Sequence, residues 1–147
     1  MPPRAPVLAA LVAAACTPAS PRDSVDVTLT GLGLGLRVPL ATTVEPGPDG
    51  ATLTTAPGAR VSPRITLHRG PGVPGTTRAS LREGLVLSYT LRRDEGGSAG
   101  PVERLEGTLV LGDRRLAVTC DDQGEPPDAT WCLPFLATLR PAPAPPR

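Results

Sequence analysis

Apolar and polar residues alternate along much of this chain, which is the pattern of a β-strand with one buried face. The alternation begins at Val25–Leu29 and resumes at Leu32–Val38, where leucines alternate with glycines, so the sequence predicts a strand pair or one bent strand. The run GLGLGL at 31–36 does not match a nucleotide-binding loop, because Leu36 stands where the third glycine is required. We therefore expect these glycines to lie on one face of a strand.

Further strands are predicted wherever the alternation recurs between turn residues. They cover residues 51–55, 65–69, 85–92, 102–111 and 115–120. Pro46–Gly50 predicts a turn that joins Val44 to the strand at 51–55, and Gly112-Asp113 predicts a tight hairpin. The loops are expected at 70–75 and 92–100, and Thr76–Glu83 is expected to form one or two helical turns.

A short helix is predicted near the C-terminus. Pro134 is tolerated in a first helical turn, and Trp131, Phe135 and Leu139 then share one face of the helix. A strand explains this segment less well, because Pro134 would interrupt its hydrogen bonds. The predicted fold class is therefore α+β, a mainly antiparallel β-sheet with a short C-terminal helix, and the alternative is an all-β sandwich.

The first residues have the pattern of an export signal. Arg4 precedes an apolar run from Val7 to Ala15, which is shorter than the roughly 20 residues that a membrane-spanning helix needs. The sequence therefore predicts a signal peptide at 1–15. The remainder is predicted to contain a lipid-anchored linker at 16–24, one small β-rich domain at 25–140 and a disordered proline-rich tail at 141–147.

Two cleavages compete before Cys16. Alanines 13–15 fit ordinary signal peptidase, whereas a small residue directly before Cys16 fits the bacterial lipobox, although Ala13 replaces its usual large aliphatic residue. Cysteine parity favours lipidation of Cys16, because Cys120 and Cys132 can then pair in an exported protein with three cysteines. That disulfide would contribute about 3 kcal/mol. With Thr17 in place of an aspartate after the cysteine, we expect the protein at the periplasmic face of the cell envelope, on the outer membrane.

The balance of charges argues against nucleic acid as a partner. All 15 basic residues are arginines, and removing Arg4 with the leader leaves 14 of them against 14 acids. The abundance of Ala, Gly, Pro and Arg is that of GC-rich codons, so we interpret the arginines as a property of the genome. A nearly neutral domain without a basic cluster in its sequence is not expected to bind nucleic acid.

The loop between Cys120 and Cys132 is the most conspicuous polar feature, with acids and no basic residue. Its acids are Asp121, Asp122, Glu125 and Asp128. These carboxylates are suitable donors for Ca²⁺, but their spacing differs from that of an EF-hand, so a polar turn or a protein-contact loop is the preferred interpretation. A covalently closed loop whose like charges are not neutralised is suited to a basic surface, and we expect it to bind a protein partner.

The sequence does not supply an acid, a base and an orienting group in one pattern. His68 is the only histidine, which excludes a zinc site with two histidines, and the absence of lysine excludes serine-lysine hydrolases. Glycosidase-like pairs could be formed by Glu103 with Glu106 or by Glu83 with Glu125, but we interpret Glu103 and Glu106 as the solvated face of a strand. We therefore expect no enzymatic activity and no cofactor.

Two segments, Gly96–Cys120 and Trp131–Arg140, resemble the C-terminal half of small periplasmic lipoproteins that act as immunity proteins against type VI secretion toxins. The final strands and helix are also similar to PsbP-like α+β domains. The immunity-protein resemblance implies a non-enzymatic binder that occludes the cleft of a toxin effector attacking peptidoglycan, with a lipid anchor in the membrane. The second hypothesis is a structural or assembly lipoprotein of the envelope.

Overall fold

The computed structural model describes residues 24–55, 63–98, 100–124, 126–144 and 146–147. The predicted signal peptide, Cys16, almost all of the predicted linker and Glu125 lie outside these residues. Within them, no helix has the length and apolar character needed to cross a membrane.

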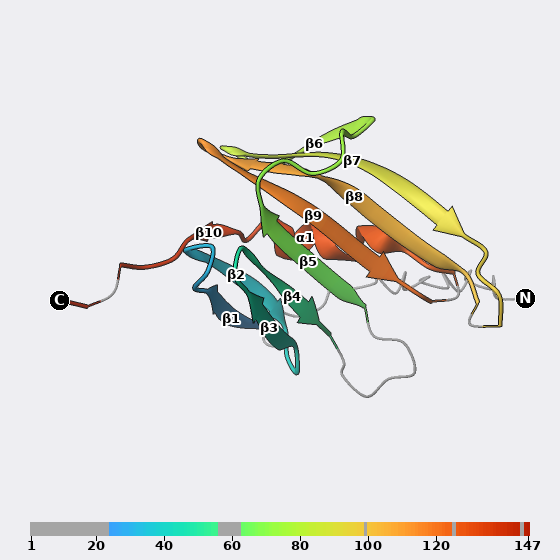
Figure 1. The fold of residues 1–147 in the computed structure, drawn as a ribbon, viewed down its shortest axis with the longest axis horizontal. Coiled ribbons are helices and arrows are strands. Elements are labelled where there is room, and N and C mark those ends of the chain that lie inside the picture. Colours follow the sequence, from blue (N-terminus) through green and yellow to red (C-terminus); the bar gives the residue numbers. More distant parts are fainter. Residues whose placement is uncertain (1–23, 56–62, 99, 125, 145) are drawn as a thin grey trace, which may run out of the picture.

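A seven-stranded antiparallel sheet forms the larger layer of the domain (Figure 1). Its strand order is β3-β4-β5-β9-β8-β7-β6. The strands are β3 (Thr43–Gly47), β4 (Gly50–Thr54), β5 (Arg64–Arg69), β6 (Thr77–Arg82), β7 (Leu85–Asp94), β8 (Val102–Leu111) and β9 (Arg114–Asp122). The three longest, β7, β8 and β9, are consecutive hairpins, and the predicted Gly112-Asp113 turn joins the last two.

A smaller layer packs against one face of this sheet. It contains β1 (Ser24–Leu29), β2 (Leu34–Pro39), β10 (Arg140–Pro141), the 3₁₀ helix η2 (Ala129–Cys132) and α1 (Leu133–Leu136). The three strands form a second antiparallel sheet in the order β1-β2-β10. The structure confirms the predicted fold class, because it is mostly antiparallel sheet with one short helix near the C-terminus.

The core lies between the two layers, and strand alternation supplies it. Ile65 and Leu67 of β5 and Leu105 and Leu109 of β8 are fully buried, while the residues between them face the opposite side of the sheet. The second layer contributes fully buried residues to the same core, namely Leu34, Leu36, Leu136 and Leu139. Each fully buried leucine or isoleucine contributes about 1.5–3 kcal/mol to folding.

The prediction of helical turns at Thr76–Glu83 is wrong. Residues Thr77–Arg82 form β6, an edge strand that pairs antiparallel with β7 and has a register shift between Ser80 and Arg82. An unpaired edge of β7 would otherwise expose its backbone groups, and this pairing outweighs the local helical preference. The bulge also positions Arg82, whose guanidinium donates hydrogen bonds to the carbonyl oxygens of Ala137 and Leu139.

The expectation that the glycines of GLGLGL lie on one face of a strand is wrong. Only Gly35 lies in a strand, and residues 30–33 form the turn between β1 and β2. Gly33 has a φ of 64°, a left-handed conformation that favours glycine. The sequence therefore encodes the predicted strand pair by placing a glycine in its turn.

The C-terminal helix is present, with Pro134 in its first turn, but its buried face differs from the prediction. The fully buried residues are Cys132, Leu136 and Leu139, whereas Trp131 and Phe135 are half-buried with ring centroids 6.0 Å apart. The physical reason is that the segment begins as a 3₁₀ helix, whose three residues per turn change the phase of the pattern.

Two connections also differ in detail from the expected loops. Strand β7 continues to Asp94, because Arg92 and Arg93 still pair with β8, so the hairpin loop begins after Asp94. Pro141 belongs to β10, and the Ala142 amide donates to the carbonyl oxygen of Gly33 at 3.0 Å, so the start of the predicted tail belongs to the sheet.

The connection between β5 and β6 crosses the open face of the large sheet. The Gly70 amide donates to the carbonyl oxygen of Arg115 at 3.0 Å, and the Gly72 amide donates to Oγ1 of Thr108 at 2.9 Å. A β-carbon at Gly72 would collide with the carbonyl oxygen of Gly107. Glycine is therefore required where this segment lies directly on the sheet.

Candidate functional site

A disulfide joins β9 to the helical segment. Cys120 and Cys132 are bonded, with their α-carbons 6.6 Å apart, and both side chains are fully buried. The bond therefore holds the start of the helical segment against the sheet, and it is the pairing expected from cysteine parity.

Asp121 lies directly after the buried Cys120, so its side chain is on the open face of the sheet. Its carboxylate accepts a hydrogen bond from Nε of Arg104, which lies opposite it on β8, at 2.5 Å. This hydrogen bond raises the pKa of the Arg104 guanidinium above its ordinary value. Asp121 is therefore neutralised by a neighbouring strand.

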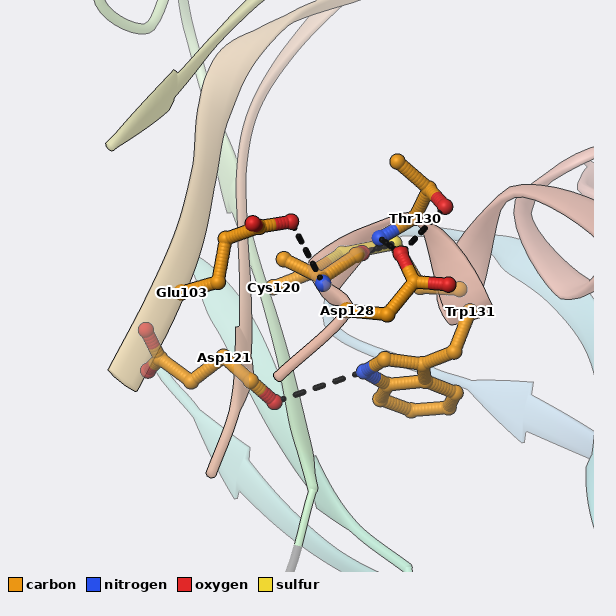
Figure 2. The surroundings of a disulfide bond; sticks show 8 residues. Glu103, Cys120, Asp121, Asp128, Thr130 and Trp131 are labelled. Carbon is orange, nitrogen blue, oxygen red and sulfur yellow. Dashed lines mark hydrogen bonds between the residues drawn. A yellow bond between two sulfur atoms is a disulfide. The ribbon is translucent and has the colours of Figure 1, made fainter. Parts of the chain in front are cut away.

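Asp122 and Asp128 hold the loop in shape. The Asp122 carboxylate accepts a hydrogen bond from the backbone amide of Asp128 at 2.8 Å. Asp128 is the N-cap of η2, and its carboxylate accepts hydrogen bonds from the amide and the hydroxyl of Thr130. Glu103 of β8 accepts from the amide of Ala129 at 3.0 Å (Figure 2).

The expectation of a loop of unneutralised acids is therefore wrong for Asp121, whereas Asp122 and Asp128 keep their negative charge and accept hydrogen bonds from neutral groups. The first amides of a helix have no partner within the helix, and carboxylates are favourable acceptors for them. We name the cluster formed by Glu103, Asp121, Asp122 and Asp128 the capping cluster. Figure 2 shows Glu103 and Asp121 on the sheet beside the disulfide, with the indole of Trp131 donating to the carbonyl oxygen of Asp121 at 3.4 Å.

The structure describes only one of the two candidate carboxylate pairs of a glycosidase, Glu103 with Glu106, and it does not assemble. Glu103 and Glu106 project from opposite faces of β8, because side chains alternate along a strand and these two are three positions apart. Glu83 lies in the turn between β6 and β7, while its predicted partner Glu125 lies outside the described residues. His68 is exposed on β5, paired in register with Gly50 and Ala117.

A metal site is also not formed by the part of the chain that the structure describes. No three side chains of His, Cys, Asp or Glu in that part are grouped closely enough to hold a metal ion. The carboxylates of the capping cluster instead accept hydrogen bonds from backbone amides, from a hydroxyl and from a guanidinium.

Sequence reasoning missed the partners of these acids. Asp128 before a helical segment is a recognisable N-cap signal. The pairing of Arg104 with Asp121 and of Glu103 with Ala129 had no such signal, because the members of each pair come from different elements. Arg104 meets Asp121 through strand register, and Glu103 meets Ala129 because η2 packs beside β8.

The domain matches known proteins in sequence pattern and in fold. A family model described as the type six secretion immunity 3 domain matches residues 35–140. No curated protein matches significantly. A solved structure from Bacteroides thetaiotaomicron VPI-5482 is similar, with a TM-score of 0.55 and 11% identity over 77% of this chain and 46% of that chain. At this identity the likeness concerns the fold alone, and the chain spans less than half of that protein's length.

Proposed function

Because the chain belongs to the type six secretion immunity 3 family, we propose that it is a non-enzymatic inhibitor of a secreted toxin that degrades peptidoglycan. The observation that carries this proposal is the extent of the family match. Residues 35–140 include all seven strands of the large sheet, the disulfide and the helical segment. An immunity protein acts by binding its toxin, so the function depends on a surface of this domain.

The rigidity of the domain supports a role in binding. The disulfide and the capping cluster hold Asp128, Ala129 and Cys132 against β8 and β9 before any partner binds. A surface that is already ordered loses little conformational entropy when it binds, and this increases affinity.

We propose that the segment Asp121–Asp128 is one contact with the toxin. Asp128 is exposed, and the side chain of Asp121 retains 25% of its accessible surface. Asp121, Asp122, Glu125 and Asp128 would present a negative edge to a basic surface, where charge complementarity speeds association. Their internal hydrogen bonds support this role, because they position the carboxylates.

We also propose that Cys16 carries a lipid that holds the protein at the periplasmic face of the outer membrane. Two features of the sequence support an anchor, the apolar leader before Cys16 and the parity of the three cysteines. Since Cys120 and Cys132 are joined to each other, Cys16 is the one cysteine left without a disulfide partner. The periplasm is also where a toxin acting on peptidoglycan would have to be neutralised.

The proposal is tested by searching beside the gene for one that encodes a secreted hydrolase and by mixing that hydrolase with the mature protein. We expect a stable complex in size-exclusion chromatography and stoichiometric inhibition of peptidoglycan hydrolysis in vitro. Loss of the gene should sensitise cells only when that toxin is present. Envelope leakage on deletion in cells without the toxin, with no complex formed, would instead support the structural lipoprotein.

A further inference from the structure

The chain has three aromatic residues, and two of them lie together on the helical segment. Trp131 and Phe135 are both half-buried, with ring centroids 6.0 Å apart and ring planes at 57° to each other. A tilted arrangement at this distance is favourable for two aromatic rings. Pro134, which stands between them in the sequence, is exposed. The two rings and the proline therefore give the helical segment an apolar surface that is still partly open to solvent.

The core does not explain the position of Phe135. Cys132 and Leu136 are fully buried and form the contact of the helical segment with the core. Trp131 packs partly against this core, and its indole donates to the carbonyl oxygen of Asp121 at 3.4 Å. Phe135 does not pack against the core, so its ring gains only part of the free energy that full burial would give. Aromatic rings placed in this way are typical of residues that a protein partner buries.

A carboxylate lies one turn before the indole. Asp128 is the N-cap of η2, and because a 3₁₀ helix has three residues per turn, Asp128 and Trp131 lie on the same face of the segment. Figure 2 shows this order, with the Asp128 carboxylate at Thr130 and the indole on the next turn. Phe135 follows one α-helical turn after Trp131. We name the row formed by Asp128, Trp131 and Phe135 the acid-aromatic stripe.

The charge of the stripe is negative and is not compensated locally. The carboxylate of Asp128 is exposed and accepts hydrogen bonds from the amide and the hydroxyl of Thr130, which are neutral groups. Within the residues that the structure describes, no arginine forms an ion pair with Asp128. The aromatic rings add to this field, because the face of an aromatic ring carries partial negative charge. The stripe is therefore complementary to a cation.

We infer that the acid-aromatic stripe binds a basic side chain of the toxin. This inference rests on the proposed function. A guanidinium or ammonium group is attracted to the face of an aromatic ring, most strongly to that of tryptophan, and the Asp128 carboxylate attracts the same cation. The aliphatic stem of a long basic side chain can cover the rings of Trp131 and Phe135. An acidic side chain would be repelled, so the stripe selects a basic partner.

The stripe is ordered before the toxin binds. The disulfide attaches Cys132, the residue after Trp131, to Cys120 of β9. Pro134 has a restricted backbone, and the indole is held by the carbonyl oxygen of Asp121. Rings that are already positioned lose little conformational entropy on binding, which favours their use as anchors.

A titration that needs no toxin tests the stripe directly. Trp131 is the only tryptophan, so the tryptophan fluorescence of the mature protein reports on this surface. The protein is titrated with a hexaarginine peptide, and with hexaglutamate and hexaglycine as comparison ligands at the same ionic strength. We expect a saturable change of the emission with hexaarginine only. No saturable change with hexaarginine, or an equal change with hexaglutamate, would overturn the inference.

Two variants separate the stripe from general charge and from folding. Asp128→Asn removes the negative charge and keeps an acceptor for the Thr130 amide, because asparagine is as good an N-cap as aspartate. Phe135→Ala removes a ring that does not pack against the core. Each variant should weaken hexaarginine binding about fivefold, because each removes one of the groups that attract the cation.

Each variant has a matched control elsewhere in the domain. Asp113→Asn makes the same charge change at an exposed acid in the β8–β9 turn, which forms no ion pair in the described part of the chain. Val73→Ala truncates a side chain that is 44% exposed in the β5–β6 connection. Neither control should alter the titration. A loss of affinity in a control equal to that in its matched variant would overturn the inference.

The toxin complex supplies the second measurement. We expect Phe135→Ala to speed dissociation of the complex about tenfold, while Val73→Ala leaves the dissociation rate unchanged. Equal dissociation rates for the wild type and Phe135→Ala would overturn the inference and leave the proposed function intact. A wild-type protein that binds no toxin would refute the proposed function, and the peptide titration would still decide whether the stripe binds basic side chains.

Discussion

The carboxylate of Asp122, the last residue of β9, accepts a hydrogen bond from the backbone amide of Asp128 at 2.8 Å. Asp128 in turn caps the 3₁₀ helix that carries Cys132. Two acids that were expected to repel each other are thus connected, because the carboxylate of Asp122 accepts the backbone N–H of Asp128. The order of the segment between the cysteines therefore depends on these carboxylates as well as on the disulfide.

Asp128→Ala should destabilise the domain by about 1 kcal/mol, because the amide and hydroxyl of Thr130 lose their acceptor. The measurement is the free energy of unfolding by denaturant titration. Glu45→Ala on β3 is the matched control, since Glu45 is exposed and has no hydrogen bond or ion pair in the described residues. Equal destabilisation by the two variants would show that the cap contributes nothing specific.

Removing the disulfide with Cys120→Ala and Cys132→Ala together should cost about 2–5 kcal/mol. The bond closes a loop and holds a fully buried contact between β9 and the helical segment. The measurement is the denaturation midpoint of the wild type and of the double variant, each with and without reductant. Reductant should lower the midpoint of the wild type only. Thiol titration of the oxidised, unfolded mature protein should find neither Cys120 nor Cys132 reactive, and labelling of both would refute the pairing.

Stability should decrease in acid partly through Asp26. Hydrogen bonds from Arg37 and then from Arg140 lower the pKa of Asp26 below its ordinary value of 3.8. A group whose pKa is lower in the folded state stabilises the fold above its ordinary pKa, and this contribution is lost as the pH falls through the folded value.

The measurement is the thermal midpoint between pH 6 and pH 2 at low and high salt. Asp26→Asn should reduce the decrease below about pH 4, with a smaller effect at high salt because the pair is exposed. Identical pH profiles for the wild type and Asp26→Asn would contradict this assignment.

Cys16→Ser should release the protein from membranes into the soluble periplasmic fraction, if the cysteine is the lipid attachment site. The experiment is cell fractionation with immunodetection of the protein. A Cys16→Ser protein that still sediments with membranes would defeat the lipoprotein proposal.

Changing Asp121 and Asp122 to Asn and Glu125 to Gln should leave the thermal midpoint nearly unchanged, because amides keep the shape and an acceptor oxygen. Association with the toxin should slow, and its salt dependence should become weaker. Alanine at Asp121 and Asp122 should additionally lower the midpoint, since Arg104 and the Asp128 amide lose their acceptors. Unaltered association would move the contact surface away from this segment.

Much of the fold follows from the sequence, because strand alternation and turn residues are local signals. The hairpins at Pro46–Gly50 and at Gly112-Asp113 were predictable from the conformations those residues favour. The segment at 76–83 was not predictable in this way. Its local preference was outweighed by the open edge of β7, which is known only when the strand order is known.

The chemistry of the charged residues was decided by tertiary structure. From the sequence, the acids after Cys120 are a negative loop and the arginines form no basic cluster. Strand register places Arg104 beside Asp121, and the 3₁₀ helix turns Asp128 into a cap, so these negative charges are engaged internally. The same strand order brings Arg69 and Arg114 to the β1–β2 turn, where they donate hydrogen bonds to its carbonyl oxygens. Sequence alone determined most of the elements, with β6 as an exception, since propensity is local, whereas charge compensation depends on distances between elements that only packing sets.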